Sequence, residues 1–271
     1  MIKITNDNYF LPTIEALQGI DELGSGTTKP MLIRGVCRKT HEKSDYVVKY
    51  RNAPRMSVEA SCRELLASFI AKELEMNVAE PALINVSPEF VDSLRGMEGY
   101  KNANNSIGIN YGSKFFGQGF IEFLQNQKLN ENQYEQAEQI FALDIFISNA
   151  DRRKDKQNML TDGEKIIIFD HELAFGFVMD IIKNPTPWLI SDEDKSWIKN
   201  HFFYPVLKDN EHNFDTFVES FEKLDTNFWK KADFLIPQEW KTKQVDDIKN
   251  NLTSLIKNKS IFLQELNKVL K

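Results

Sequence analysis

The chain has 271 residues, of which 41% are hydrophobic, and it includes 20 Phe, 7 Tyr and 4 Trp. This is enough core-forming material for two domains or one large two-lobed domain, and it excludes a disordered, fibrous or small disulfide-stabilised protein. The net charge of −6 argues against generic nucleic-acid binding, and the longest apolar runs are far shorter than the ~20 residues that cross a bilayer.

The first 120 residues predict a small lobe of strands with one helix. A glycine-containing turn at residues 24–30 precedes two β-like runs, 31–37 and 46–50, which are typical of a hairpin. Apolar side chains then recur at helical spacing over residues 58–74, behind Ser57 as a suitable N-cap. Residues 82–86 predict another strand, and residues 107–123 predict an extended stretch interrupted by glycines. We therefore expect residues 1–120 to form a β-rich N-terminal lobe.

The rest of the chain, residues 121–271, predicts a larger and mainly helical C-terminal lobe. Residues 131–148 carry apolar side chains on one helical side, whereas residues 149–158 are too polar for a core element. Two short apolar runs then flank Asp162 and Gly163, which suit a two-residue type I′ hairpin turn. Helical patterns dominate after Asp170, so the fold class is α+β with two closely packed lobes.

Cysteine and histidine usage gives no sign of a metal or disulfide framework. Cys37 and Cys62 form no paired motif, and we expect both to be buried thiols. The four histidines lack the spacing of zinc sites. The first ten residues become polar before an apolar segment can form, so we expect no secretory signal and a cytoplasmic protein.

Three oxygen-bearing side chains surround the predicted hairpin. A two-residue turn would place Asn158 opposite Ile167, so Asp151, Asn158 and Asp170 would gather at one end of the hairpin. Carboxylate and amide oxygens are the ligands that Mg²⁺ prefers when it binds with nucleotide phosphates. Each residue alone also has a common structural role in capping a turn or helix. Together they indicate a phosphoryl-transfer site.

A lysine in the N-terminal lobe strengthens this interpretation. Lys49 lies inside the apolar run of residues 46–50, where a charge is costly unless it is paired. If Val47 and Lys49 face the core, Glu64 on the following helix is a suitable partner. A strand lysine held by a helix glutamate and directed at nucleotide phosphates recurs in protein kinases. The alternative is a lysine that extends to water and a solvated glutamate.

The order of several segments resembles the HipA-like kinases, particularly short members that lack a DNA-binding module. These segments read GSGTTKP, DYVVKYRN, CRELLASFIAKELEMNVAEPALI, NYGSKFFGQ, FALDIFISNADRRKDKQNML and IIIFDHELAF, and the resemblance covers roughly residues 15–180. It implies a bilobed protein-kinase-like fold. It also implies transfer of the γ-phosphate of ATP, with Mg²⁺, to a Ser or Thr of a protein substrate. Members are often toxins restrained by an antitoxin protein.

The resemblance implies roles for individual residues. Asp151 matches the catalytic aspartate, and Asn158 and Asp170 match the metal ligands. The implied ATP-binding residues are Gly24, Ser25, Gly26, Lys49 and Glu64. Two features depart from the common kinase pattern: His171 follows Asp170 in place of Phe-Gly, and Asn158 lies seven positions after Asp151 instead of five.

Two alternatives keep the same fold. One is a phosphotransferase for small cationic molecules, and the acidic excess in residues 192–239 leaves it open. The other is a non-catalytic, partner-binding pseudokinase, whose mark would be loss of the lysine or of a metal ligand; none is lost. We expect no direct contact with DNA and no association with membranes. Arg152, Arg153 and Lys154 either add positive potential beside Asp151 or are solvated loop charges.

Overall fold

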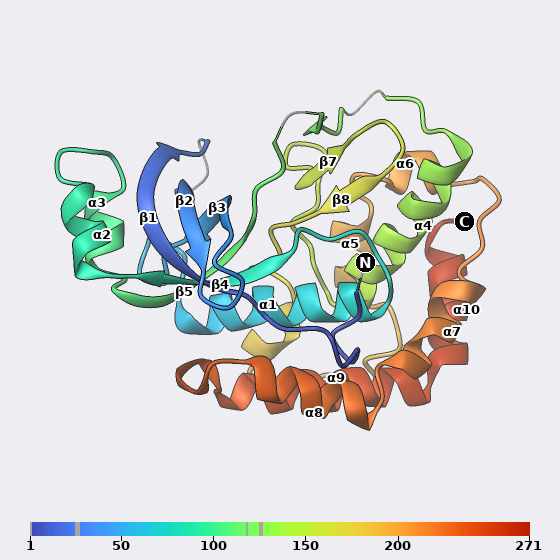
Figure 1. The fold of residues 1–271 in the computed structure, drawn as a ribbon. Coiled ribbons are helices and arrows are strands. Elements are labelled where there is room, and N and C mark those ends of the chain that lie inside the picture. The colour runs from blue at the N-terminus through green and yellow to red at the C-terminus, as the bar shows by residue number, and fades with distance from the viewer. Residues whose placement is uncertain (1, 25–27, 118, 125–126) are drawn as a thin grey trace.

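Five strands of the N-terminal lobe close into a small barrel (Figure 1). Around the barrel the order is β1 (Thr13–Glu22), β2 (Met31–Cys37), β3 (Lys43–Lys49), β5 (Gly108–Lys114) and β4 (Pro81–Val86). Neighbours are antiparallel, except that β1 and β4 pair in parallel. This computed structural model describes residues 2–24, 28–117, 119–124 and 127–271.

The alternation of side chains along β3 divides the barrel interior from the outside. Tyr46 and Val48 belong to the apolar core of the barrel, together with Tyr50 just after the strand. Val47 and Lys49 point the other way, because successive side chains of a strand project from opposite faces. Val47 and Lys49 therefore share a face, and that face lines the cavity outside the barrel core.

The strand β1 was not predicted from the sequence, although it closes the barrel. Its pairing with β2 shifts register between Ala16 and Gln18 and again between Gly19 and Asp21. Such bulges break the period-two alternation of apolar and polar residues that identifies a strand. The predicted strand at residues 31–37 is confirmed, and the predicted strand at 82–86 corresponds to β4.

The helix α1 (Val58–Glu73) joins the barrel to the helical part of the molecule. It begins where predicted, and the Ser57 hydroxyl accepts a hydrogen bond from the Ala60 amide at 3.1 Å. Every residue from 60 to 73 is buried. Ala60 packs in the barrel core, whereas Leu65 and Phe69 pack in a second, larger core built mainly from the C-terminal helices.

The second half of the chain is mainly helical, as predicted. Its central helix α4 (Glu131–Phe146) starts with a reciprocal capping box between Asn130 and Gln133. A three-stranded sheet of β6 (Ile121–Glu122), β7 (Met159–Thr161) and β8 (Ile166–Ile168) lies beside it. The other helices are α2 (Pro88–Ser93) and α3 (Tyr100–Asn104) in the first half, and α5 (Asp192–Ile198), α6 (Tyr204–Leu207), α7 (Asp215–Glu219), α8 (Thr226–Leu235), α9 (Lys243–Lys257) and α10 (Lys259–Val269) in the second.

The hairpin β7–β8 differs from the prediction by two residues in register. Met159 pairs with Ile168 and Thr161 with Ile166, so the loop has four residues instead of two. The reason is the Asp162 side chain, whose Oδ1 accepts hydrogen bonds from the amides of residues 164 and 165 and stabilises the longer loop. Asn158 consequently lies next to Phe169, whose amide donates to the Asn158 carbonyl oxygen at 3.2 Å.

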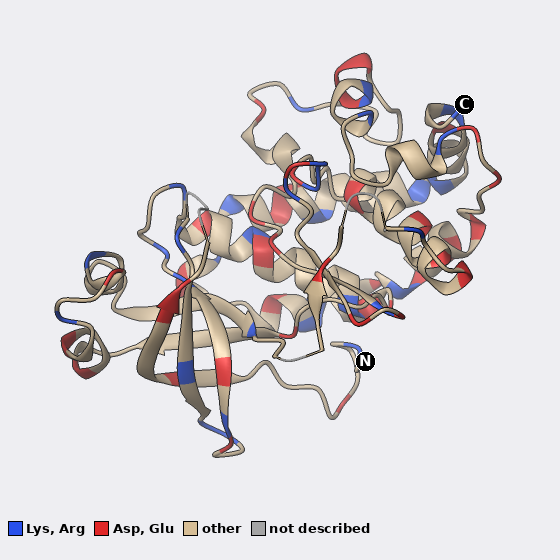
Figure 2. Ribbon diagram, turned by 90° about the horizontal axis from the view of Figure 1, so that it is seen from above, with Lys and Arg blue, Asp and Glu red and all other residues tan. Residues whose placement is uncertain are grey.

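Three further sequence expectations concern charge, thiols and membranes. Figure 2 shows Lys and Arg interspersed with Asp and Glu over both halves of the molecule. Cys37 and Cys62 are buried free thiols, as expected. Across the described ranges, no helix combines the length and hydropathy that a bilayer crossing requires.

The N-cap of α1 gives the first testable prediction. Ser57→Ala removes the side-chain acceptor for the Ala60 amide and should lower the free energy of unfolding by about 1 kcal/mol. Ser57→Thr, which retains a hydroxyl, should lose clearly less. Chemical denaturation of the three proteins measures the difference. Equal stability of Ser57→Ala and the parent chain would show that the cap contributes nothing.

Candidate active site

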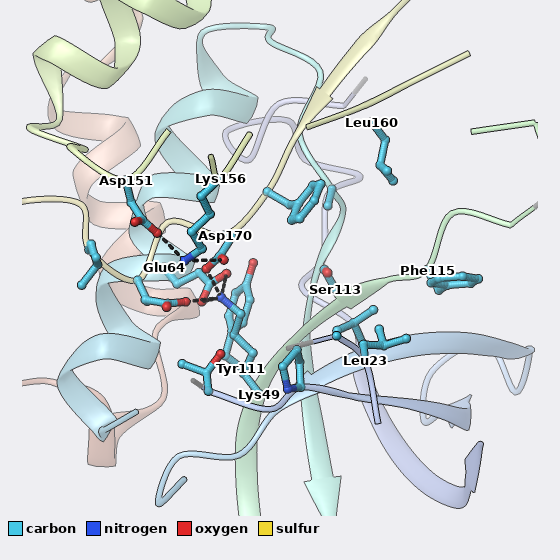
Figure 3. A pocket seen from close by; sticks show the side chains of 18 of the residues that line it. Leu23, Lys49, Glu64, Tyr111, Ser113, Phe115, Asp151, Lys156, Leu160 and Asp170 are labelled. Carbon is cyan, nitrogen blue, oxygen red and sulfur yellow. Dashed lines mark hydrogen bonds and ion pairs between the residues drawn. The ribbon is translucent and has the colours of Figure 1, made fainter. Parts of the chain in front are cut away.

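A cavity of about 580 Å³ lies between the barrel and the helical part of the molecule (Figure 3). The barrel contributes Leu23, Val47, Lys49, Tyr111 and Ser113 to its wall. The other wall carries Asp151, Lys156, Leu160, Phe169, Asp170 and Glu172, and α1 contributes Glu64. Lys49, Glu64, Asp151, Lys156 and Asp170 gather at one end of the cavity, here called its floor. Leu23, Phe115 and Leu160 lie toward the other end, here called its outer part (Figure 3).

Lys49 is the centre of the charged floor. Its ammonium nitrogen lies 2.8 Å from Glu64 Oε2 and 2.5 Å from Asp170 Oδ1, and it also donates to Glu172. The lysine is only 7% exposed and Glu64 only 1%, so these charges are removed from water. Burial opposes the charge on Lys49, but the three carboxylates raise the pKa of this lysine well above its ordinary value.

Local packing explains why Glu64 meets the lysine. Lys49 pairs with Tyr111 across β3 and β5, and the Tyr111 hydroxyl lies 3.1 Å from Ser68 Oγ on α1. Ser68 lies one helical turn after Glu64, so the same face of α1 supports both contacts. Burial raises the pKa of Glu64 to about 7, although Lys49 acts in the opposite direction.

Glu172 is a site residue that sequence reasoning missed. It lies two residues after Asp170, and both carboxylates reach the same lysine. Burial raises the pKa of Glu172 to about 8 against the opposing charge of Lys49, and the neighbouring Asp170 carboxylate adds to the rise. The pKa of Asp170 stays well below its usual range because Lys49 and Lys156 outweigh its burial. The available signal was the spacing of the two acids in residues 170–172.

Lys156 is the second missed residue. It forms an ion pair with Asp151, and its ammonium nitrogen lies 3.3 Å from Asp170 Oδ2 (Figure 3). The lysine thus connects the predicted catalytic carboxylate to the predicted metal ligand. The sequence placed it in a polar loop, and polarity alone does not distinguish a lysine that faces a cavity from one that faces water.

The remaining predicted residues lie differently with respect to the cavity. Gly24 lines it, in a left-handed backbone conformation with φ of 67°. Ser25 and Gly26 lie outside the described residues. Asn158 belongs to the adjacent hairpin but is not among the residues that line the cavity. Its Nδ2 atom is buried and has no hydrogen-bond partner within the described part of the chain.

The three basic residues after Asp151 lie in different surroundings. Arg152 is 1% exposed, pairs with Asp144 beneath the loop and does not line the cavity. Arg153 lines the cavity, and its guanidinium lies 4.0 Å from the Asp151 carboxylate. Lys154 is exposed and is not part of the cavity wall.

The donor set fits a hard divalent cation. Carboxylate oxygens of Glu64, Asp170 and Glu172 all lie within 4.8 Å of one another. Asp151 lines the same cavity, where Lys49, Lys156 and Arg153 lie beside these acids. Oxygen ligands of this kind suit Mg²⁺ and exclude the soft, thiolate-binding metals.

Comparisons with known proteins agree with the geometry. A family model described as HipA-like kinase matches residues 19–268. The chain is similar in fold to the Helicobacter pylori proinflammatory kinase CtkA, with a TM-score of 0.53, 15% identity, and coverage of 92% of this chain and 93% of that chain. The Neurospora crassa PAN3 pseudokinase is also matched, with a TM-score of 0.35, 14% identity, and coverage of 97% and 68%. No curated protein matches the sequence. The predicted bilobed, kinase-like α+β fold is confirmed.

The raised pKa values of Glu64 and Glu172 give a prediction for stability against pH. Above about pH 4.5 the unfolded chain releases the protons of these two carboxyl groups, whereas the folded protein retains them. Their contribution to the free energy of unfolding is therefore complete below about pH 4.5, and it is lost as the pH rises through about 7 for Glu64 and about 8 for Glu172. Glu172→Gln keeps a neutral side chain and removes one titration. The fall in unfolding free energy between pH 5 and 8 should become shallower, by at most about 1.4 kcal/mol per pH unit.

Denaturant titrations at several pH values measure this slope. Glu42→Gln, on an exposed residue at the edge of the barrel, is the control and should leave the slope unchanged. A slope in Glu172→Gln as steep as that of the parent chain would contradict the assignment of a buried, proton-binding carboxyl.

Proposed function

Since this chain belongs to the HipA-like kinase family, we propose that it is an ATP- and Mg²⁺-dependent kinase that phosphorylates Ser or Thr side chains of a protein. The observation that carries the proposal is Lys49, held by Glu64 and Asp170 on the floor of a cavity that also contains Asp151. This arrangement combines a cation for phosphates, a metal ligand and a proton acceptor.

The apolar outer part of the cavity is suited to a nucleotide base. Leu23 and Val47 of the N-terminal half and Leu160 and Phe169 of the second half all line the cavity. A planar base between such side chains is removed from water on both faces. Its phosphates would then extend toward Lys49, which Glu64 holds in place.

Asp170 and Asn158 would hold Mg²⁺, and Glu172 lies close enough to share in its ligation. The cation, when bound, neutralises charge on the nucleotide phosphates. The buried Nδ2 of Asn158, which lacks a partner among the described residues, is a donor and would need an acceptor such as a phosphate oxygen, whereas Oδ1 is the atom that would ligate Mg²⁺.

Asp151 would accept the proton of the acceptor hydroxyl and orient its oxygen toward the γ-phosphate. Lys156 holds the Asp151 carboxylate in the cavity and adds positive charge beside it. Positioning and charge neutralisation by these side chains supply most of the catalysis in phosphoryl transfer.

We further propose two lobes, residues 1–120 and 121–271, a cytoplasmic location, and action as a toxin restrained by an antitoxin protein. The support is the family and the retained charged residues. A small-molecule phosphotransferase is the second candidate, because the same charged side chains would serve transfer to a small-molecule hydroxyl. Retention of Lys49, Asn158 and Asp170 favours either kinase over a pseudokinase.

Incubation with Mg²⁺ and γ-labelled ATP, alone and in cell lysate, tests the proposal. Label on a protein band, at Ser or Thr by mass spectrometry, is the expected result. Label on a small molecule would instead support the second candidate. Absence of transfer and of nucleotide binding would contradict both.

Asp170→Asn and Asp151→Asn should have different effects. Loss of the anionic ligand Asp170 should reduce Mg²⁺-dependent transfer by more than about 100-fold and weaken binding of Mg²⁺-ATP. Asp151→Asn should preserve nucleotide binding and lower kcat by about 100- to 10,000-fold. Calorimetric titration with ATP and a transfer assay separate the two effects. Equal loss of ATP affinity in both variants would show that the roles are not distinct.

Lys49 and Glu64 should be energetically coupled. Lys49→Ala and Glu64→Ala should each weaken kcat/KM for ATP, and the double variant should lose less than the sum by about 0.5–3 kcal/mol. Kinetic measurement of all four proteins completes the cycle. Strict additivity would mean that Glu64 does not act through the lysine.

A further inference from the structure

A buried arginine lies beneath the proposed catalytic loop and touches both proposed metal-ligand segments. We infer that Arg152 is a positioning residue that fixes Asn158 and Asp170 relative to each other; this inference rests on the proposed function. Arg152 does not line the cavity, so it acts through its neighbours.

Asp144 on α4 anchors the arginine. Its Oδ2 accepts from Arg152 Nε at 2.6 Å, and both side chains are fully buried. The same carboxylate lies 3.0 Å from His201 Nε2 and accepts from Asn149 Nδ2 at 2.8 Å. Arg152 and His201 outweigh burial and hold the pKa of Asp144 well below its usual range. The anion therefore stays charged and fixes the guanidinium to the helix.

The other side of the guanidinium faces the two ligand segments. Nη1 donates to the carbonyl oxygen of Asn158 at 2.6 Å, and Nη2 lies 3.1 Å from Nε2 of His171. Arginine only donates, so Nε2 of His171 is the acceptor. His171 is the residue directly after Asp170. One planar group thus contacts α4, the end of the loop and the residue beside the strand-end carboxylate.

The backbone at both ligands needs such support. Asn158 has φ of 50° and Asp170 has φ of 62°, a left-handed conformation that costs energy for residues with a side chain. The Asn158 carbonyl oxygen accepts from the Phe169 amide as well as from Arg152, so the guanidinium stabilises the contact between the two segments. Without Arg152, Asn158 and His171 each lose a charged donor.

A simple Arg152→Met variant would leave Asp144 buried and unpaired and could unfold the chain. The test therefore uses Asp144→Asn with Arg152→Met, which removes both charges. The single amide oxygen that remains can accept from either Asn149 or His201. Arg152→Lys is the second variant. An ammonium group can pair with Asp144, but it lacks the several N–H donors of a guanidinium that reach Asn158 and His171 at the same time. Lys72→Met, which removes a buried lysine paired with Glu80 away from the cavity, is the matched control.

Two measurements follow. The first is the Mg²⁺ concentration needed for half-maximal ATP binding by calorimetry, which should rise about 10- to 100-fold in the double variant and in Arg152→Lys. The second is hydrogen exchange of the Phe169 amide without ligands, which should accelerate in both variants. Binding of ATP without Mg²⁺ should be unchanged, and Lys72→Met should match the parent chain in both measurements.

Parent-like Mg²⁺ dependence and Phe169 exchange in either folded variant would overturn the inference and leave Arg152 with a purely structural role. If the parent chain itself binds no Mg²⁺-ATP, the proposed function fails. The exchange of Phe169 then still decides whether Arg152 holds the two segments together.

Discussion

The buried ammonium group of Lys49 is the interaction on which the cavity depends. A lysine that is 7% exposed is stable only if carboxylates surround it. Glu64 comes from α1, and Asp170 and Glu172 come from the segment that follows β8. The requirement to neutralise one charge therefore brings the barrel, the helix and the second sheet to a single point. The same requirement concentrates negative charge where a cation can bind.

A second buried ion pair, beneath the loop that carries Asp151, likewise holds separate segments of the chain together. Arg152 and Asp144 are both removed from water, and they connect the central helix to segments that no apolar contact could orient. Hydrogen bonds have direction, whereas apolar packing has little. The two ion pairs thus explain how residues far apart in sequence hold defined positions around one cavity.

Much of the site was predictable because its residues interrupt apolar patterns. Lys49 within a strand and Asp170 after one are conspicuous for this reason, and the structure brings both together with Glu64 and Asp151. The roles of Lys156 and Arg152 were not predictable, because a polar loop has no periodicity to say which side chains turn inward. The register of β7–β8 and the bulged strand β1 depended on side-chain hydrogen bonds and backbone irregularities that periodicity cannot detect.

The shared packing of α1 has a mechanical consequence. Most of the helix is embedded in the larger core, whereas β3 belongs to the barrel, so the Glu64–Lys49 ion pair crosses the boundary between the two cores. Rotation of the barrel would stretch or shorten the ion pair directly. The distance between these two groups would therefore report the position of the barrel relative to the larger core, and spectroscopic labels on β3 and α1 can measure it.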